Sequence, residues 1–243
     1  MVHSSNTNSS AAIKLILSGI QKNPGCSLVF ASDSLSGDVI LLHDINNASR
    51  PKKAVSIVIC TYGRPESLND TLESLTHQTF KDFEVILITE RGDLSVLRDK
   101  GLRLSHADIV SLIDDDVYCE PTWLQAVVEA FKEKGIVGVT GRTTITQEYR
   151  GNRDIFKYRW LKKLYDLLFL GKKALLPGQL SACGTPSMRS NDMDCSYNGP
   201  VDYLEACNMS VKKKEAIDVG GFDTVYYKTS EWSEVELSLR LGK

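Results

Sequence analysis

Three consecutive carboxylates, Asp114, Asp115 and Asp116, follow directly on the apolar run Ile-Val-Ser-Leu-Ile at 109–113. Like charges at this spacing repel one another, so the arrangement costs stability unless a cation compensates it. Hard oxygen ligands suit Mg²⁺ or Mn²⁺, which also accept water and phosphate oxygens. The pattern therefore indicates a divalent-cation site. The structural alternative is a solvated acidic turn ahead of the helix that Pro121 opens.

The run before these carboxylates predicts a strand, because continuous Ile, Val and Leu are typical of strands covered on both faces. Three adjacent Asp have no place inside such a strand, so we expect them at its carboxyl end. Open α/β sheets bind their ligands at that end. The acid cluster is thus expected to depend on a sheet whose other strands bring partners to the same edge.

Two further apolar runs, 54–60 and 83–88, predict the neighbouring strands. Helices expected from Pro65 and over 94–105 alternate with the strands, which predicts right-handed crossovers and a parallel sheet. All strand ends then lie on one edge. The polar residues expected to converge there are Thr61, Arg64, Glu90, Asp114, Asp115 and Asp116.

The remaining chain divides into an N-terminal appendage with a linker, 1–53, and a main domain, 54–243. We expect disorder over 1–10, a helix over 11–21 and short strands over 27–31 and 38–42. Beyond the acid cluster we expect a helix over 122–134, a strand over 136–140, loosened pattern over 143–200, a strand over 201–211, a helix over 212–219 and a last helix from 231.

Composition limits the function classes. The chain has 243 residues, 42% of them hydrophobic and 25% charged, which is typical of a globular protein. A net charge of −2 gives no field that would attract nucleic acid. No apolar run reaches the roughly 18 residues of a membrane span, and no signal peptide is apparent, so a cytoplasmic protein is expected. Six Cys without a CxxC pair disfavour zinc.

The segment 155–176 mixes aromatic residues and Leu with Lys and Arg. An amphipathic helix with a basic face could lie on the inner face of a membrane, and the alternative is that its apolar stripe packs on the domain itself. No GxGxxG or GxxxxGK[ST] pattern follows any predicted strand, which disfavours a dinucleotide fold and a P-loop.

Five motifs in order resemble the nucleotide-sugar-dependent glycosyltransferases of family 2, which have the GT-A fold. They are the strand and loop 58–64, the "ARNxG"-like Leu97-Arg98-Asp99-Lys100-Gly101, the DxD-like 114–116, the "GxNM…GGFD"-like 207–209 with 220–223, and the "EDvDLslRl"-like 233–241. The resemblance implies a Rossmann-like, mostly parallel sheet with helices on both faces, beside a small α+β appendage. It also implies sugar transfer from a UDP- or GDP-sugar to a glycan, a lipid-linked or a small-molecule acceptor.

The resemblance also assigns residues to the donor. Asp116 and Asp114 would hold Mn²⁺ or Mg²⁺ on the diphosphate, and Asp114 would contact the ribose. The rest of the implied nucleotide-sugar site is Thr61, Tyr62, Arg64, Glu90, Arg98 and Asp115. Arg98 would steady the acidic wall or the diphosphate, and a structural ion pair is its alternative role.

Glu234 falls where the family has its general base, which would deprotonate the acceptor hydroxyl and lead to inversion. The alternative is an ordinary first-turn acid that the helix dipole stabilises. Ser233-Glu234 replaces the family's Glu-Asp, and the chain ends at Lys243, ahead of a segment that commonly follows. These departures keep an impaired nucleotide-sugar-binding relative open as an alternative. A sugar-1-phosphate nucleotidyltransferase is disfavoured, because Thr61-Tyr62-Gly63-Arg64-Pro65 is not a Gly-rich basic loop.

Overall fold

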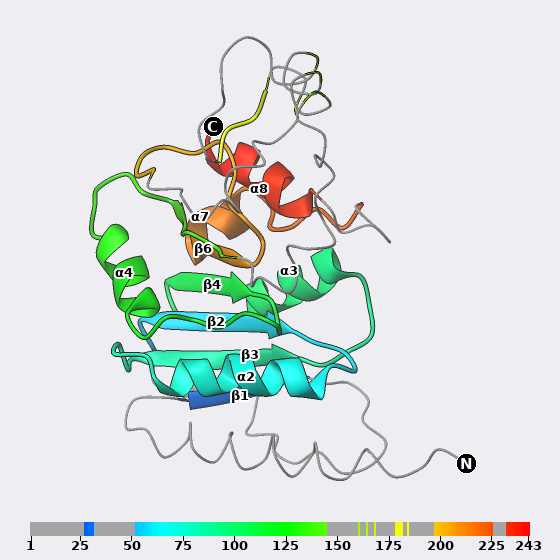
Figure 1. The fold of residues 1–243 in the computed structure, drawn as a ribbon, viewed down its shortest axis with the longest axis vertical. Coiled ribbons are helices and arrows are strands. Elements are labelled where there is room, and N and C mark those ends of the chain that lie inside the picture. Colours follow the sequence, from blue (N-terminus) through cyan, green and yellow to red (C-terminus); the bar gives the residue numbers. More distant parts are fainter. Residues whose placement is uncertain are drawn as a thin grey trace.

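The computed structural model describes residues 27–31, 52–144, 160, 164, 168, 178–181, 184, 197–225 and 232–243. The helix expected over 11–21 and the strand expected over 38–42 lie outside these residues, as does most of 143–200. The described residues form an α/β domain, and the strands of its sheet lie side by side in Figure 1.

In the described part of the chain, one sheet has the strand order β1-β3-β2-β4-β6-β5. Its strands are β1 Ser27–Ala31, β2 Val55–Cys60, β3 Phe83–Ile88, β4 Ile109–Ile113, β5 Gly138–Thr140 and β6 Asn208–Lys212. Strands β1, β3, β2 and β4 run parallel, and β6 runs antiparallel to both β4 and β5. The expected mostly parallel sheet is confirmed.

The strand expected over 27–31, in the predicted N-terminal appendage, is present as β1. β1 pairs with β3 along its whole length, from Ser27 opposite Glu84 to Ala31 opposite Ile88. It thereby forms the edge of the same sheet, next to a strand that carries one rim of the candidate site (Figure 1). The chain before the linker is thus joined to the domain through backbone hydrogen bonds.

Helices cover both faces of the sheet, as expected. They are α2 Pro65–Thr76, α3 Leu94–Leu104, α4 Trp123–Ala130, α7 Lys213–Asp218 and α8 Ser233–Leu241. Residues of β2 alternate between the two cores, because successive strand side chains point to opposite faces. Ile57 packs under α2 and α4, whereas Val58 packs under α3, α7 and α8. The described residues therefore have the expected α/β architecture, a mostly parallel sheet with helices on both faces.

Helix α3 lies close against the sheet because one of its residues is a glycine. A Cβ atom placed on Gly101 would collide with Cγ1 of Val58 in β2. This close contact explains why the "ARNxG"-like segment has a glycine at position 101. It also sets the distance between the sheet and Arg98, which lies one turn earlier in α3.

Three element boundaries differ from the sequence-based expectation. Helix α4 ends at Ala130, and its C-cap Phe131 returns its N–H to Val127 O, so the turns that follow are not helical. The strand expected over 201–211 begins only at Asn208, because its pairing with β4 starts there and its pairing with β5 starts at Met209. Leu204, expected in that strand, is instead buried in the core under α8. The strand expected over 136–140 is shorter for a similar reason: β5 pairs with β6 only from Gly138.

Among the residues described, no helix has the length and hydrophobicity needed to cross a bilayer.

Candidate active site

The carboxyl ends of three parallel strands are level with one another. Cys60 of β2 lies opposite Ile88 of β3, and Ile59 lies opposite Ile113 of β4. Thr61 is buried there, and its N–H donates to Ile88 O across 2.9 Å. The expected convergence of the strand ends is confirmed, and the polar residues that follow them begin at neighbouring positions.

Arg98 links two of the predicted site residues. Its guanidinium donates from Nη2 to Asp114 Oδ1 at 3.1 Å, and Nη1 lies 3.9 Å from Glu234 Oε2. Only 7% of the Arg98 side chain is exposed, compared with 35% for Asp114 and 19% for Glu234. A buried cation therefore joins an acid at the end of β4 to an acid in the first turn of α8.

Arg64 makes a second, more open group with the other two carboxylates. Its Nη2 lies 2.5 Å from Asp115 Oδ1, and its Nη1 donates to Asp116 Oδ2 at 3.2 Å. Asp115 is fully buried, and its two oxygens have the ion pair but no well-aligned hydrogen bond. Acceptor capacity thus remains in the acid cluster, as expected of a site that receives a further cation or water.

The remaining predicted donor residues lie at the ends of β2 and β3. Glu90 Oε1 lies 2.5 Å from the ammonium of Lys100, which projects from α3. Tyr62 is exposed, with 61% of its surface open to solvent. The structure thus gives Glu90 a cationic partner, and it leaves Tyr62 available at the loop that opens α2.

Cys60 stands between these groups. Burial raises the pKa of its thiol to about 12, the Arg98 cation opposes that rise, and the carboxylates of Asp114, Asp115 and Glu90 add to it. The thiol is therefore protonated at neutral pH. Cys60 therefore presents a small neutral side chain beside these charged groups, and it does not act as a nucleophile.

A hollow of about 380 Å³ lies beside the acid cluster, between α2 and the loop after β4. It is lined by Ser67, Asp70, Glu73, Asp116, Val117 and Tyr118. Asp116 thus faces the α2 side, whereas Asp114 faces Arg98 on the α3 side. The two acids predicted to share one cation thus pair with different arginines, Asp114 with Arg98 and Asp116 with Arg64.

In type and number, the partly exposed acids at this edge fit a divalent cation that a phosphate ligand completes, although each acid is paired with an arginine in this structure. Within the described residues, no three His, Cys, Asp or Glu side chains are placed to hold a metal alone. Mg²⁺ is commonly bound by one or two carboxylates together with substrate phosphates. Asp114 and Asp116 supply that number of carboxylates, and both are partly exposed.

Ser233 and Glu234 are the first residues of α8, and Glu234 lies beside Arg98. Ser233, which stands where the family has an acid, is buried and donates from Oγ to Glu234 Oε2 at 3.4 Å. The residue before them, Trp232, has a left-handed backbone with φ +76° and is 42% exposed. A bulky residue in this conformation is strained, so the surrounding structure must hold it there.

Sequence reasoning missed several residues that the site uses. Lys100 pairs with Glu90 and stands two positions after Arg98, within the same "ARNxG"-like segment. Trp123 Nε1 donates to Asn208 Oδ1 at 2.9 Å, and this bond ties the start of α4 to β6. The proximity of Lys100 to the predicted acids was the available signal, whereas nothing in the spacing indicated the Trp123–Asn208 pair.

Comparison with known proteins gives these residues a family. The model of the family described as "Glycosyl transferase family 2" matches residues 56–90 and 89–194. A glucosyl-dolichyl phosphate glucuronosyltransferase of Haloferax volcanii is 22% identical over 206 residues, 70% of this chain and 56% of that protein. An uncharacterized glycosyltransferase, YwdF, of Bacillus subtilis is 24% identical over 123 residues, 41% of this chain and 46% of that protein.

A solved structure of the mannosyltransferase PcManGT from Pyrobaculum calidifontis, in complex with GDP-Man and Mn²⁺, is similar with a TM-score of 0.47 and 11% identity. The similarity covers 96% of this chain and 60% of that one. The chain spans about half the length of the curated relatives that it matches. The family match extends over more than half of the chain and includes the strand ends that carry the acids. This chain belongs to glycosyl transferase family 2.

Proposed function

We propose that this domain transfers a sugar from a nucleoside-diphosphate sugar to an acceptor hydroxyl, with inversion, and that Glu234 is the general base. The observation that carries the proposal is the contact of one buried arginine, Arg98, with both Asp114 and Glu234. It places an acid of the donor side and the candidate base within one charged group. The donor diphosphate and the acceptor hydroxyl can then bind next to each other.

Each acid has a distinct proposed role. Asp114 and Asp116 would hold the divalent cation together with the donor's diphosphate, and Asp114 would also contact the ribose. When bound, the cation stabilises the charge that develops on the leaving diphosphate. Asp115, which is buried against Arg64, holds that arginine in place at the nucleotide loop. Thr61, Tyr62 and Glu90 complete the donor pocket in this proposal.

Glu234 takes the proton of the acceptor hydroxyl while the hydroxyl oxygen attacks the anomeric carbon of the sugar. The bond from that carbon to the diphosphate oxygen breaks as the new bond forms, and the configuration inverts. The carboxylate is well suited to this step because it is partly buried and Arg98 lies on one side of it. Arg98 also keeps two acids close together without net repulsion.

A thermal-shift experiment tests the donor half of the proposal. UDP or GDP with Mn²⁺ is expected to raise the melting temperature, and Asp116→Asn is expected to remove the rise while leaving the unliganded melting temperature nearly unchanged. Glu129→Gln, which changes an exposed acid on α4, is the matched control. If neither nucleotide stabilises the native chain with Mn²⁺, the donor assignment is wrong.

The second candidate function, a binding module without catalysis, is separated by a different variant. Glu234→Gln keeps the size of the side chain and removes its basicity. We expect it to lower sugar transfer at least about a hundredfold and to leave the nucleotide-dependent thermal shift intact. Absence of transfer in the native chain, together with normal nucleotide binding, would favour the binding module.

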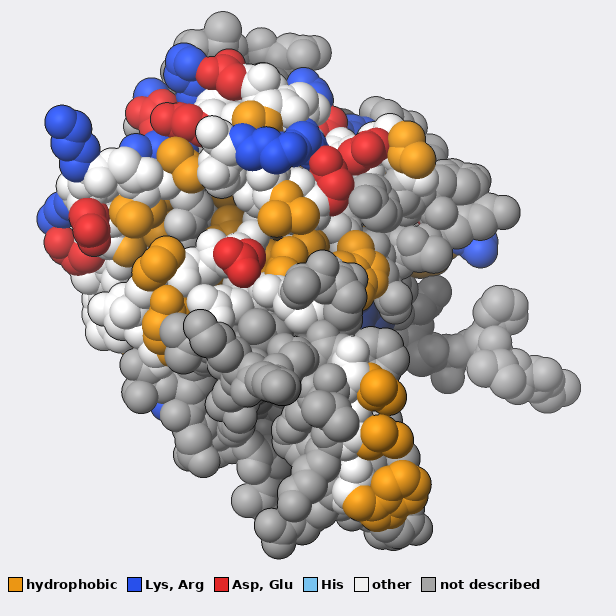
Figure 2. Space-filling view, turned by 90° about the horizontal axis from the view of Figure 1, so that it is seen from above, with side chains coloured by type: hydrophobic (Ala, Val, Ile, Leu, Met, Phe, Trp, Pro, Cys, Tyr) orange, Lys and Arg blue, Asp and Glu red, His pale blue; other side chains and the backbone are white. Residues whose placement is uncertain are grey.

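The acceptor is proposed to be lipid-linked, and an anionic lipid surface is the proposed docking partner of 155–176. Trp160, Leu164 and Leu168 are spaced as one helical face and are exposed by 63%, 44% and 64%. Figure 2 shows hydrophobic side chains in a row at its lower right. The segment holds six Lys or Arg and one Asp, which complements anionic headgroups. The Haloferax relative acts, by its name, on a dolichyl phosphate.

Sedimentation with vesicles tests this contact. The chain is expected to bind phosphatidylglycerol vesicles more strongly than phosphatidylcholine vesicles, and replacing Trp160, Leu164 and Leu168 by Ala is expected to abolish binding. Val225→Ala, at a side chain that is 82% exposed elsewhere, is the control. Equal sedimentation of the triple variant and the native chain would contradict the docking proposal.

A further inference from the structure

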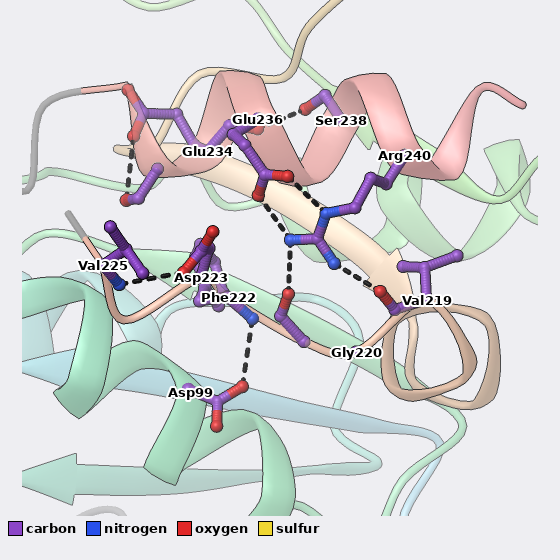
Figure 3. A network of polar contacts seen from close by, with 12 residues as sticks. Asp99, Val219, Gly220, Phe222, Asp223, Val225, Glu234, Glu236, Ser238 and Arg240 are labelled. Atoms are coloured by element: carbon purple, nitrogen blue, oxygen red, sulfur yellow. Dashed lines mark hydrogen bonds and ion pairs between the residues drawn. The ribbon is translucent and has the colours of Figure 1, made fainter.

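Three successive carbonyl groups after α7 accept hydrogen bonds from arginines of two different helices. Figure 3 shows the bonds that Arg240 makes. Arg240 of α8 donates to Val219 O and, at 2.7 Å, to Gly221 O. Arg103 of α3 donates to the carbonyl between them, Gly220 O, at 3.1 Å. The turn therefore lies between the two helices and is bonded to both.

The two glycines make this sharing of carbonyls possible. Gly220 N donates to Ile217 O at 2.9 Å and Gly221 N donates to Ala216 O at 2.8 Å, which is the bond pattern of a Schellman cap. Their φ angles of +106° and +78° lie in the left-handed region that favours glycine. The cap ends α7 sharply and turns successive carbonyls in alternate directions, toward α8 and toward α3.

Asp99 completes the contact on the α3 side. Its Oδ1 accepts the N–H of Phe222 at 3.0 Å, and its Oδ2 accepts Arg103 Nε at 2.7 Å. A Cβ on Gly221 would collide with Asp99 Oδ1, so the turn and α3 approach more closely than a side chain permits. We call Asp99, Arg103 and Arg240, with the carbonyls of 219–221, the turn clamp.

The turn clamp joins the two helices that carry the central charged pair. Asp99 follows Arg98 directly on α3, and Arg240 stands on the same helix as Glu234. Arg240 is itself held by Glu236, through Nε to Oε1 at 2.5 Å. The 3.9 Å separation between Arg98 Nη1 and Glu234 Oε2 therefore depends on how the clamp sets α8 against α3.

We propose that Arg240, Arg103 and Asp99 are positioning residues that hold Glu234 in reach of the acceptor by fixing α8 on α3, an inference that rests on the proposed function. The "GGFD"-like segment then acts through its backbone. The carbonyl groups of this segment accept hydrogen bonds from both helices. Phe222 is buried and is therefore not exposed to substrate.

Other contacts keep α8 folded when the clamp is weakened. Val235 and Leu237 are buried in the core, and Ser238 Oγ accepts the N–H of Leu204 at 3.0 Å. Arg240→Lys retains the positive charge but cannot donate to two carbonyls from a planar fork. This variant is therefore expected to fold and to loosen the placement of α8 alone.

The kinetic arm measures sugar transfer by Arg240→Lys. We expect kcat to fall about tenfold or more while the donor KM stays within about twofold, because the base is misplaced but the donor pocket is not. In the Glu234→Gln background, Arg240→Lys is expected to cause no further loss in the residual rate. Equal fractional losses in both backgrounds would overturn the proposal, since the clamp would then act independently of Glu234.

The second arm is amide hydrogen exchange, which needs no activity. Arg240→Lys is expected to accelerate exchange in α8 and to leave α2 unchanged, whereas Lys214→Gln, which removes an exposed ion pair on α7, changes neither. Unchanged exchange in α8 would overturn the clamp. If the native chain transfers no sugar from any donor, the proposed function fails, and the exchange result still decides whether the clamp fixes α8.

Discussion

The guanidinium of Arg98 and the carboxylate of Asp114 form a 3.1 Å hydrogen bond at the end of β4, and the arginine side chain is almost completely buried. This contact joins two separate segments of the chain: helix α3, which follows β3, and the acids that follow β4. Because a buried cation without partners is costly, the position of each residue depends on the other.

Replacing Arg98 is expected to affect activity and stability separately. Arg98→Lys keeps the charge but cannot reach Asp114 and Glu234 together, so we expect kcat/KM to fall about a hundredfold with little change in melting temperature. Arg98→Met leaves two acids without their cation and should cost about 3 kcal/mol of unfolding free energy. Denaturant titrations and initial-rate measurements on both variants check this prediction. Equal activity in Arg98→Lys and the native chain would contradict it.

Trp232 is the second target, because its strained backbone and its exposed ring lie two residues before Glu234, the proposed base. In Trp232→Gly, relief of the left-handed strain offsets the loss of apolar contact, and the unfolding free energy should stay within about 1 kcal/mol of the native value. We expect the acceptor KM to rise about tenfold, since aromatic rings stack on sugars and aliphatic chains through their apolar faces. Trp232→Phe should retain most of the native acceptor KM. A normal acceptor KM in Trp232→Gly would exclude acceptor contact.

The packing of α3 on β2 gives a prediction about stability alone. Gly101→Ala inserts a methyl group against Val58 and is expected to lower the unfolding free energy by about 2 kcal/mol. Val58→Ala makes room for that methyl group, so the double variant should be more stable than the sum of the two single losses predicts. Urea unfolding of the four proteins measures the coupling. Strictly additive losses would show that the two positions do not touch.

Alkaline pH should weaken the fold through its buried thiols. Burial raises the pKa of Cys119 from 9.0 to about 12, so this thiol contributes stability below pH 9 that is lost as pH rises toward 12. The full shift corresponds to about 4 kcal/mol. Cys119→Ala should show a shallower fall of unfolding free energy between pH 9 and 11 than the native chain. Parallel pH curves would refute the assignment.

The parts of the fold that depend on local pattern were predictable. β2, β3 and β4 each appear as a run that is apolar except for one residue, because strands covered on both faces need few polar positions. Helix α2 was predicted from Pro65 and a single apolar stripe. β6 was predicted too long, because its start is set by partner strands and not by its own residues. Nothing in 201–207 reveals that those partners are missing.

The candidate site was predictable as a set of residues but not as a set of pairs. The acids after β4 and the loop after β2 were identified from strand ends, and the structure brings those ends level. The pairing of Arg98 with Glu234, and of Arg64 with Asp115, depends on how helices pack across the sheet. The distances within these pairs depend on how the whole core packs, and the spacing of residues along the chain does not reveal them.

The ladder between β5 and β6 has a consequence for how the chain can vary between relatives. The chain leaves the sheet after Thr140 and returns at Asn208, and Thr140 lies opposite Met209 on the neighbouring strand. Because exit and entry are side by side, the intervening residues can be lengthened, shortened or exchanged without shifting a strand. This stretch can therefore change in evolution while the sheet that carries the acids stays the same.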